Sequence, residues 1–109
     1  MWRSLPTLSN YLISSEGRIY SLTHNKLMQI DHSNKYDRIQ LYDNKTKKHY
    51  KISRLVATAF CPGADQGKIV HHINCDHTDN RAANLIWATP SQHKLIHRAI
   101  SQDRKETMM

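Results

Sequence analysis

The sequence has few cysteines and no long apolar run, and each shortage excludes a class of protein. Its 109 residues include two cysteines, Cys61 and Cys75, which form no CxxC pair and are too few for a zinc ribbon. The N-terminus has no apolar core of signal-peptide length, and no stretch approaches the roughly 18 apolar residues of a membrane span. We therefore expect a cytoplasmic protein with reduced thiols and no membrane association, since nothing in the sequence indicates the export that a disulfide would need.

Aromatic and acidic residues are also scarce. Phenylalanine occurs once, apolar residues make up 39% of the chain and the mean hydropathy is −0.70, so a single domain with a modest core is expected. Domains of this size often use a bound metal or ligand for stability. The 16 Lys and Arg residues against 9 acidic ones give a net charge of +7. This balance favours a polyanionic partner, with nucleic acid first and an anionic membrane surface second, and a soluble protein that is merely basic is the alternative.

The first half of the chain has the pattern of short antiparallel strands. Residues 11–22 place apolar pieces on either side of Ser-Glu-Gly, which predicts a β-hairpin, and residues 27–30 could add a short strand. Residues 36–42 alternate polar and apolar side chains, and residues 47–52 return as their antiparallel partner after a turn at Asp43-Asn44. We expect these strands to form a small β platform.

A short helix is predicted after the platform. Ser53 is expected to cap a helix over residues 54–60, which carries an apolar stripe and ends at Cys61-Pro62-Gly63. The outward face of the platform combines amide and cationic side chains that could contact phosphates or base edges, because a two-stranded ribbon fits a major groove. The alternative for each of them is a solvated polar face. The DNA-contacting candidates on this face are Arg38, Gln40, Lys47 and Lys51.

Four histidines fall on two predicted elements in the second half. A short strand at residues 69–70 presents His71 and His72 at its end, on opposite sides of the strand. A loop rich in Asp and Asn then leads to a second strand at residues 85–88. Thr89 as N-cap, Pro90 at the first helical position and Gln92 predict a helix to about Ile100, which places His93 and His97 at i and i+4 on one face.

These histidines could form a metal site. His71, His93 and His97 would supply three nitrogen ligands and leave open positions for water and substrate, as in catalytic metal sites. An i,i+4 histidine pair by itself is usually an accident of a helix surface, and so is a pair of adjacent histidines. Both together, joined by Asn84 and a capped helix, favour the metal site.

At this point the residues resemble a known family. The segment Val-His-His-Ile-Asn-Cys-Asp at 70–76, followed by Asn80, Asn84-Leu85, Trp87, Thr89-Pro90-Ser91 and His93, is similar to the HNH motif of nucleases with the ββα-metal fold. Residues 11–22 resemble the modular segment that precedes HNH domains in phage and intron homing endonucleases. The resemblance runs from about Trp2 to His97. It implies an α+β fold with a DNA-contacting module at 1–60, an HNH module at 61–100 and a polar tail at 101–109, in one compact domain overall.

The resemblance also implies roles for the site residues. His72 would be the general base that activates a water, His71 and His93 would hold a divalent cation, and Asn84 would steady the loop and the base histidine. His97 matches an extra helix histidine that is a ligand or phosphate contact in colicin-type nucleases. Many homing members have Asp where His71 stands, so Mg²⁺ or Mn²⁺ is expected as cofactor, and Zn²⁺ or Ni²⁺ fits an imidazole. Glycine is common where Cys75 stands, and His77 is expected to be a solvated turn residue. Phosphate contacts on the helix are expected from Lys94 and Arg98, with helix-surface charge as the alternative.

The function implied is a metal-dependent DNA endonuclease that leaves 3′-hydroxyl and 5′-phosphate ends. One site per chain predicts nicking by a monomer, or double-strand cutting by a weak homodimer, with double-stranded DNA as partner; a phage-encoded chain would act in the host cytoplasm. The alternatives are a DNA-binding module with a structural or vestigial metal site, and RNA cleavage. The chain ends a dozen residues after His97, so either the β platform reads the DNA, or recognition is loose, or a further DNA-reading segment belongs to a longer chain.

Overall fold

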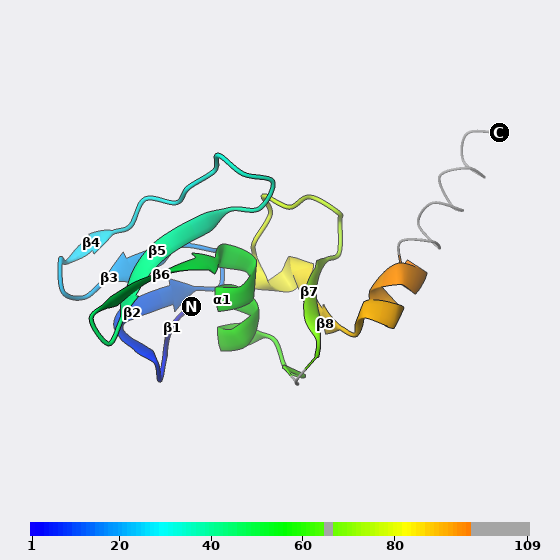
Figure 1. The fold of residues 1–109 in the computed structure, drawn as a ribbon, viewed down its shortest axis with the longest axis horizontal. Helices are drawn as coiled ribbons and strands as arrows, with labels where there is room; N and C mark the ends of the chain where they lie inside the picture. Colours follow the sequence, from blue (N-terminus) through cyan, green and yellow to red (C-terminus); the bar gives the residue numbers. More distant parts are fainter. Residues whose placement is uncertain (65–66, 97–109) are drawn as a thin grey trace.

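The computed structural model describes residues 1–64 and 67–96 (Figure 1). It is an α+β fold with small antiparallel sheets and few helices, as predicted. A helix over residues 90–96 closes the described part of the chain. The other elements, in order, are β1 Trp2–Leu5, β2 Leu8–Ser14, β3 Ile19–Ser21, β4 Lys26–Leu27, β5 Arg38–Asp43, β6 Thr46–Lys51, α1 Ile52–Phe60, β7 Ile69–His72, the 3-10 helix η1 Ala82–Asn84 and β8 Leu85–Ala88.

The upstream platform consists of a four-stranded sheet in the order β1-β2-β3-β4 and a two-stranded ribbon, β5–β6. Their apolar faces belong to one core: Ile13 and Ile19 of the four-stranded sheet and Ile39 and Leu41 of the ribbon are almost fully buried in the same cluster. The ribbon turns at Asn44 and Lys45, both with positive φ (49° and 67°). A two-residue turn of this kind matches the right-handed twist of the strands it joins.

The sequence predicted most of this platform and missed parts of it. The hairpin at residues 11–22 is confirmed as β2 and β3, whose register pairs Tyr11 with Ser21 and Ile13 with Ile19. The strand expected at 27–30 is only the two-residue β4, and β1 was not predicted.

The predicted cap of α1 is wrong. The helix starts at Ile52, one residue before Ser53, and Lys51 occupies the N-cap position without a side-chain hydrogen bond. The backbone N–H of Ile52 instead donates to the carbonyl oxygen of Asp37 at 3.0 Å. Because this tertiary bond satisfies a first-turn donor that a capping side chain would otherwise serve, Ser53 is free to be buried inside the first turn. The predicted C-terminal end is confirmed at Cys61, whose N–H donates to the carbonyl of Ala57.

The histidine-bearing hairpin β7–β8 packs against α1 on the side away from the platform sheets (Figure 1). Its register pairs His71 with Ile86 and His72 with Leu85. Trp87 of β8 is buried, and its indole N–H donates to the carbonyl of Ala57 in α1 at 3.3 Å. This contact fixes the hairpin to the helix and hence to the platform. No helix within the described ranges combines the length and the apolar character that crossing a bilayer requires.

Candidate active site

The end of β7 buries two adjacent imidazoles that face different surroundings. His71 and His72 are each 4% exposed, although a strand sends consecutive side chains to opposite sides. The ring of His71 meets the ring of His93 edge to face, with centroids 5.0 Å apart and planes at 72°. The ring of His72 meets that of His77, with centroids 5.3 Å apart. The two neighbours on the strand are therefore placed for different tasks.

A capping box holds His93 in position. The hydroxyl of Thr89 accepts from the N–H of Gln92 at 3.1 Å, and the side-chain oxygen of Gln92 accepts from the N–H of Thr89 at 2.9 Å. The N–H of His93 donates to the carbonyl of Thr89 at 2.9 Å in the first helical turn. This reciprocal pair was predicted from the sequence, and it orients the helix so that His93 points back at β7.

The donor set fits a divalent cation in part. Imidazole nitrogens are common ligands of divalent transition ions, and His71 and His93 bring two of them together. Within residues 1–64 and 67–96, no group of three or more His, Cys, Asp or Glu side chains is arranged around a common point. The predicted third ligand, His97, lies outside the described residues, as does Arg98. A pair of ligands leaves the remaining positions to water and substrate oxygen atoms.

The surroundings of His72 differ from those predicted. Nε2 of His72 lies 2.9 Å from the side-chain oxygen of Asn80, a residue that is itself 6% exposed. The ring of His77 meets the ring of Tyr36 at a tilt of 60° with centroids 4.5 Å apart, and His77 is half-buried rather than a solvated turn residue. The prediction assigned the support of His72 to Asn84, but the hydrogen bond comes from Asn80.

Asn84 instead ties together the loop of residues 73–84. Its side-chain oxygen accepts from the N–H of Asn74 at 3.0 Å, and its NH₂ donates to the side chain of Asn74 and to the carbonyl of Asp79, both at 2.9 Å. The predicted role in steadying the loop thus has a structural counterpart. The catalytic and metal-binding roles assigned to the individual residues stay predictions.

Charged groups on the loop are also engaged locally. The two side-chain bonds from Arg81 hold the pKa of Asp79 well below its usual range. The hydroxyl and N–H of Thr78 lower the pKa of Asp76. Both carboxylates therefore stay ionised in the folded loop, close to the histidines. Cys75 has a φ of 64°, a left-handed conformation that glycine adopts without strain, which accounts for the glycine expected at this position.

The histidines open into a small pocket of about 180 Å³ with basic side chains at its edge. Lys51 and Arg54, from the end of β6 and the first turn of α1, line it together with Tyr36 and the four histidines discussed above, His71, His72, His77 and His93. The Lys51 ammonium lies 4.5 Å above the Tyr36 ring, and the Arg54 guanidinium lies 5.7 Å from the Trp87 ring. These contacts orient two cations beside the imidazoles. The pocket can therefore accept an anionic group.

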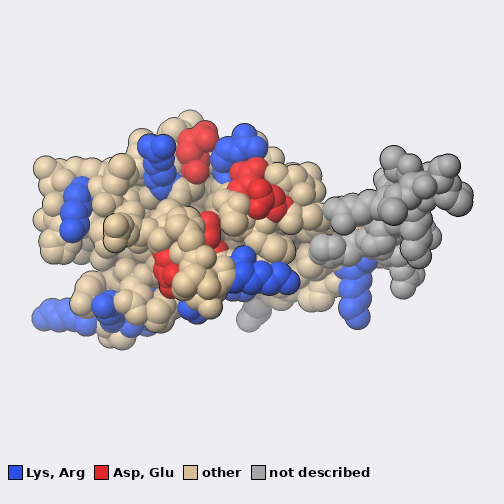
Figure 2. Space-filling model, turned by 90° about the horizontal axis from the view of Figure 1, so that it is seen from above, with Lys and Arg blue, Asp and Glu red and all other residues tan. Residues whose placement is uncertain are grey.

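The predicted DNA-contacting residues of the ribbon share one face. The register pairs Arg38 with Lys51, Gln40 with His49 and Tyr42 with Lys47, and directly opposed residues lie on the same side of a sheet. Gln40 and His49 are joined by a side-chain hydrogen bond of 2.8 Å. Figure 2 shows one side of the molecule, where Lys and Arg side chains occur along its length and acidic side chains gather toward the middle. On the helix at 90–96, Lys94 is exposed.

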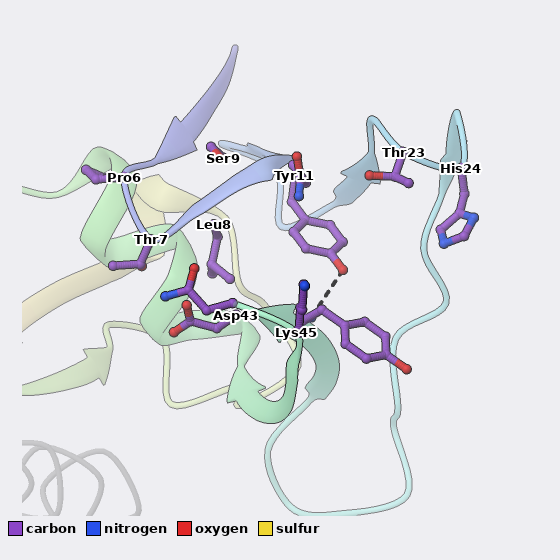
Figure 3. Close-up of a pocket in the computed structure, with 12 residues that line it drawn as sticks. Pro6, Thr7, Leu8, Ser9, Tyr11, Thr23, His24, Asp43 and Lys45 are labelled. Atoms are coloured by element: carbon purple, nitrogen blue, oxygen red, sulfur yellow. Dashed lines mark hydrogen bonds between the residues drawn. The ribbon is translucent and has the colours of Figure 1, made fainter.

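A larger hollow of about 820 Å³ is lined by none of His71, His72, His77 and His93 (Figure 3). The β1–β2 turn, Thr23-His24 and the tip of the ribbon line it, and the Tyr11 hydroxyl accepts from the N–H of Tyr42 at 3.2 Å at its base. Its lining includes neither the paired imidazoles of His71 and His93 nor His72, all of which line the smaller pocket. The smaller pocket is therefore the candidate site.

Sequence reasoning missed three residues of the site. Tyr36 and Arg54 line the pocket, and Asn80 contacts His72. A basic residue in the first turn of a helix that precedes the histidine strand was a possible signal for Arg54. For Asn80, the sequence offered only its place in the motif, because its partners lie far away along the chain.

Comparisons with known proteins agree with this geometry. Residues 50–95 match a family model described as HNH endonuclease. The DNA endonuclease I-HmuI of Bacillus phage SP01 is 34% identical over 82 residues, which cover 73% of this chain and 47% of that protein. An uncharacterised HNH endonuclease of Acanthamoeba polyphaga mimivirus is 30% identical over 113 residues, or 96% of this chain and 28% of the relative.

One solved structure is similar over nearly the whole chain. It describes DNA binding and cleavage by the HNH homing endonuclease I-HmuI, and it matches with a TM-score of 0.82 and 28% identity over 94% of this chain and 59% of that one. The likeness extends to the platform that precedes the matched family segment. The chain spans less than half the length of the curated relatives it matches.

Proposed function

The chain belongs to the HNH endonuclease family, and on that premise we propose that it is a metal-dependent endonuclease that hydrolyses phosphodiester bonds in double-stranded DNA. The observation that supports this best is the buried pair His71 and His72 at the end of β7, with His93 facing the first and two cations beside them. A base, a site for a cation and a site for a phosphate lie together in one pocket. Those are the groups that hydrolysis of a phosphodiester requires.

His72 acts as the general base in this proposal. A neutral imidazole removes a proton from water, the water oxygen attacks phosphorus, and the bond from phosphorus to the 3′ oxygen breaks as that oxygen takes a proton from solvent. The products are a 5′-phosphate and a 3′-hydroxyl. Histidine suits this step because its ordinary pKa lies near neutrality, so the ring can accept a proton at physiological pH.

Lys51 and Arg54 bind the phosphate in the pocket. Their side chains line its edge and are held by Tyr36 and Trp87, so the phosphate would meet cations that are already oriented. Arginine suits this position because its planar fork can contact two phosphate oxygens at once. The ribbon face carrying Arg38, Gln40 and Lys47 continues from Lys51, and it would contact the flanking duplex.

His71 and His93 would hold the divalent cation. When bound, such an ion stabilises negative charge on the phosphoryl group and on the departing oxygen. The donors are imidazoles rather than carboxylates, so Mn²⁺, Zn²⁺ and Ni²⁺ are candidates beside Mg²⁺. Mg²⁺ would complete its preferred octahedron mainly with water and phosphate oxygens.

A supercoiled-plasmid assay tests the proposal. Nicking is measured with Mg²⁺, Mn²⁺, Zn²⁺ or EDTA for the wild type, for His72→Ala, and for His24→Ala as an exposed histidine remote from the pocket. We expect metal-dependent nicking that His72→Ala reduces by at least roughly a hundredfold, and that His24→Ala leaves unchanged. Undiminished nicking by His72→Ala would remove the proposed base.

The alternative is a DNA-binding module with a structural or vestigial metal site. It is favoured by one observation, the exposed ribbon face with its cations and amides, which could bind duplex DNA without any cleavage. Under this alternative the protein retards duplex DNA in a gel but cuts neither DNA nor RNA with any of the metals. Both DNA and RNA are possible substrates, because attack by water needs no 2′-hydroxyl. An RNA substrate tested in parallel therefore distinguishes the two activities.

A further inference from the structure

Behind His72, away from His71 and His93, a short chain of buried hydrogen bonds leads back into the platform. Nε2 of His72 is 2.9 Å from Oδ1 of Asn80, and Nδ2 of Asn80 is 3.4 Å from Oδ2 of Asp37. These three residues are each between 4% and 6% exposed. Asp37 precedes β5, so this series of hydrogen bonds joins the platform to Asn80, which lies 43 positions later in the sequence. A buried polar chain of this kind is costly unless every member has its partner.

The chemistry of the three groups fixes the direction of each bond. An ionised carboxylate can only accept hydrogen bonds, so the group that Asn80 turns toward Asp37 must be its NH₂. The carbonyl oxygen of the same amide then faces His72, and an amide carbonyl oxygen can only accept. Nε2 of His72 must therefore carry the proton, which leaves Nδ1 as the basic nitrogen of the neutral ring.

We propose that Asp37 and Asn80 are positioning residues that set the tautomer of His72, so that Nδ1 is the atom that takes the proton from water. The role of His72 as base rests on the proposed function, whereas the tautomer is a property of the protein by itself. Asp37 lies outside residues 50–95, the segment that matches the family model. The upstream platform thus supplies part of the catalytic machinery, beyond any contact with DNA.

Asp37 is held firmly enough to act in this way. Its backbone carbonyl accepts from the N–H of Ile52 at 3.0 Å, which anchors it to the start of α1. Its other carboxylate oxygen, Oδ1, is 2.8 Å from Nδ1 of His32, and that ring nitrogen must donate because the carboxylate cannot. His32 is 67% exposed, whereas Asp37 is 5% exposed. The carboxylate is therefore fixed from two sides before it meets Asn80.

A glycine closes the other side of Asn80. A Cβ built on Gly17, in the β2–β3 turn, would lie 3.3 Å from Cβ of Asn80 and 3.3 Å from its carbonyl oxygen, and Gly17 has a φ of 89°. The neighbouring carbonyl of Ser15 accepts from the N–H of Ala82 at 2.7 Å. The β2–β3 turn therefore packs directly on this part of the loop. Gly17 thus fixes the backbone and Cβ of Asn80, and the amide is then held between His72 and Asp37.

Nitrogen NMR of the imidazole rings tests the proposal without metal or DNA. The ¹⁵N shifts of His72 distinguish the two tautomers of a neutral ring, and assignment follows from the loss of its signals in His72→Ala. We expect the wild type to have only the Nε2–H form. Asp37→Asn keeps the shape of the side chain but can donate as well as accept, so we expect a measurable Nδ1–H fraction, and a larger one in Asn80→Ala.

Nicking kinetics provide the second readout. We expect Asp37→Asn to lower kcat about tenfold or more and to leave KM within about twofold, because residues that orient a catalytic group typically act at this scale. Asp79→Asn is the matched control: it makes the same acid-to-amide change on the site loop, where it alters the contacts of Asp79 with Arg81 and Asn74 but leaves both side-chain partners of Asn80 in place. That variant should keep the wild-type tautomer and kcat. Thermal unfolding of each variant confirms that it folds.

The outcomes separate this proposal from the proposed function. An Nδ1–H ring or a mixture of tautomers in the wild type overturns the proposal, even if no variant folds. An unchanged tautomer and kcat in Asp37→Asn overturns it as well. If the tautomer behaves as expected but His72→Ala still nicks DNA, the positioning by Asp37 and Asn80 stands and the assignment of His72 as base fails.

Discussion

The two hairpins β5–β6 and β7–β8 have the same plan and use polar side chains in different ways. The ribbon β5–β6 buries Ile39 and Leu41 and leaves its cations and amides on an exposed face. The hairpin β7–β8 buries two histidines at the end of its first strand, beside the apolar residues of its second. An exposed polar residue exchanges one hydrogen-bond partner for water at little cost, but a buried one depends on a specific partner. A single substitution at a buried histidine of β7–β8 should therefore have a large effect on function. On the exposed face of β5–β6, only several substitutions together should have a large effect.

Removing the buried imidazole that is proposed to bind the cation should have the largest effect. We expect His71→Ala to lower metal-dependent nicking by at least roughly a hundredfold, because changing even the residues behind a metal ligand often costs roughly 10–100-fold. His71→Asp is the matched control, since it restores an oxygen ligand and should retain activity with Mg²⁺. Nicking rates over a metal titration measure both. Activity of His71→Ala within threefold of wild type would contradict the assignment of His71 as a ligand.

The ribbon should respond only to combined changes. We expect Arg38→Ala, Lys47→Ala and Lys51→Ala together to reduce the slope of log K against log salt by up to about 2.7, since each phosphate contact contributes about 0.9. Each single change contributes about a third of this or less. Fluorescence anisotropy with duplex DNA over a range of salt concentrations gives the slopes.

Lys48→Ala is the control for the ribbon, because Lys48 lies on the same strand but points to the opposite face and pairs with Asp43. Its slope should equal that of the wild type. A loss in Lys48→Ala as large as that in the triple variant would show that the ribbon face does not contact DNA.

The connections within the two hairpins each contain a residue with positive φ, and replacing that residue by glycine should change stability by a small amount. Lys45 in the ribbon turn and Cys75 in the site loop have φ values of 67° and 64°, which favour glycine. We expect Lys45→Gly to raise the free energy of unfolding by about 1 kcal/mol. Cys75→Gly should gain less, because Cys75 also lines the pocket and loses that contact. Urea unfolding measures both, and Cys75→Ala, which keeps the strain, should be less stable than Cys75→Gly.

The smallest expected effect is on the stability of the protein at acidic pH, through Asp79 in the loop of the site. The folded-state pKa of Asp79 lies below its ordinary value of 3.8, so its contribution to stability is present above that pH and is lost as the pH falls further. Because Arg81 is the main cause, Arg81→Ala should be slightly less stable than wild type near neutral pH, and the difference should shrink below about pH 3.8. Thermal unfolding at several pH values measures it. A difference in Tm that grows on acidification would contradict this account.

Local features of this fold were predictable, and long-range ones were not. Thr89 and Gln92 are three residues apart, so their capping box could be inferred from the sequence and is confirmed. The alternation of residues 36–42 likewise predicted a strand with Ile39 and Leu41 inside. The start of α1 was missed because Asp37 supplies a tertiary acceptor to Ile52. Sequence spacing carries no record of such a contact.

In the candidate site, too, local features were predictable and long-range contacts were not. Resemblance to a family pointed to the histidines, and their grouping follows from a strand end and a capped helix. The partner of His72 was assigned to Asn84, the residue that the motif emphasises, whereas the structure gives it to Asn80 with Asp37 behind it. A pair 43 residues apart becomes visible only when the platform and the loop are placed in space. The same holds for the approach of Gly17 to Asn80.

The bond from Ala82 to Ser15 has a consequence for how the protein is made. A ribosome releases the N-terminal residues first, so the β2–β3 turn and Asp37 are available before the loop that docks on them has been synthesised. Contacts between residues far apart in the sequence form late in folding, because the intervening chain must be ordered first. A nascent chain would therefore present the residues of this support before it acquires the hydrogen bond between His72 and Asn80. That hydrogen bond would be among the last features of the site to form.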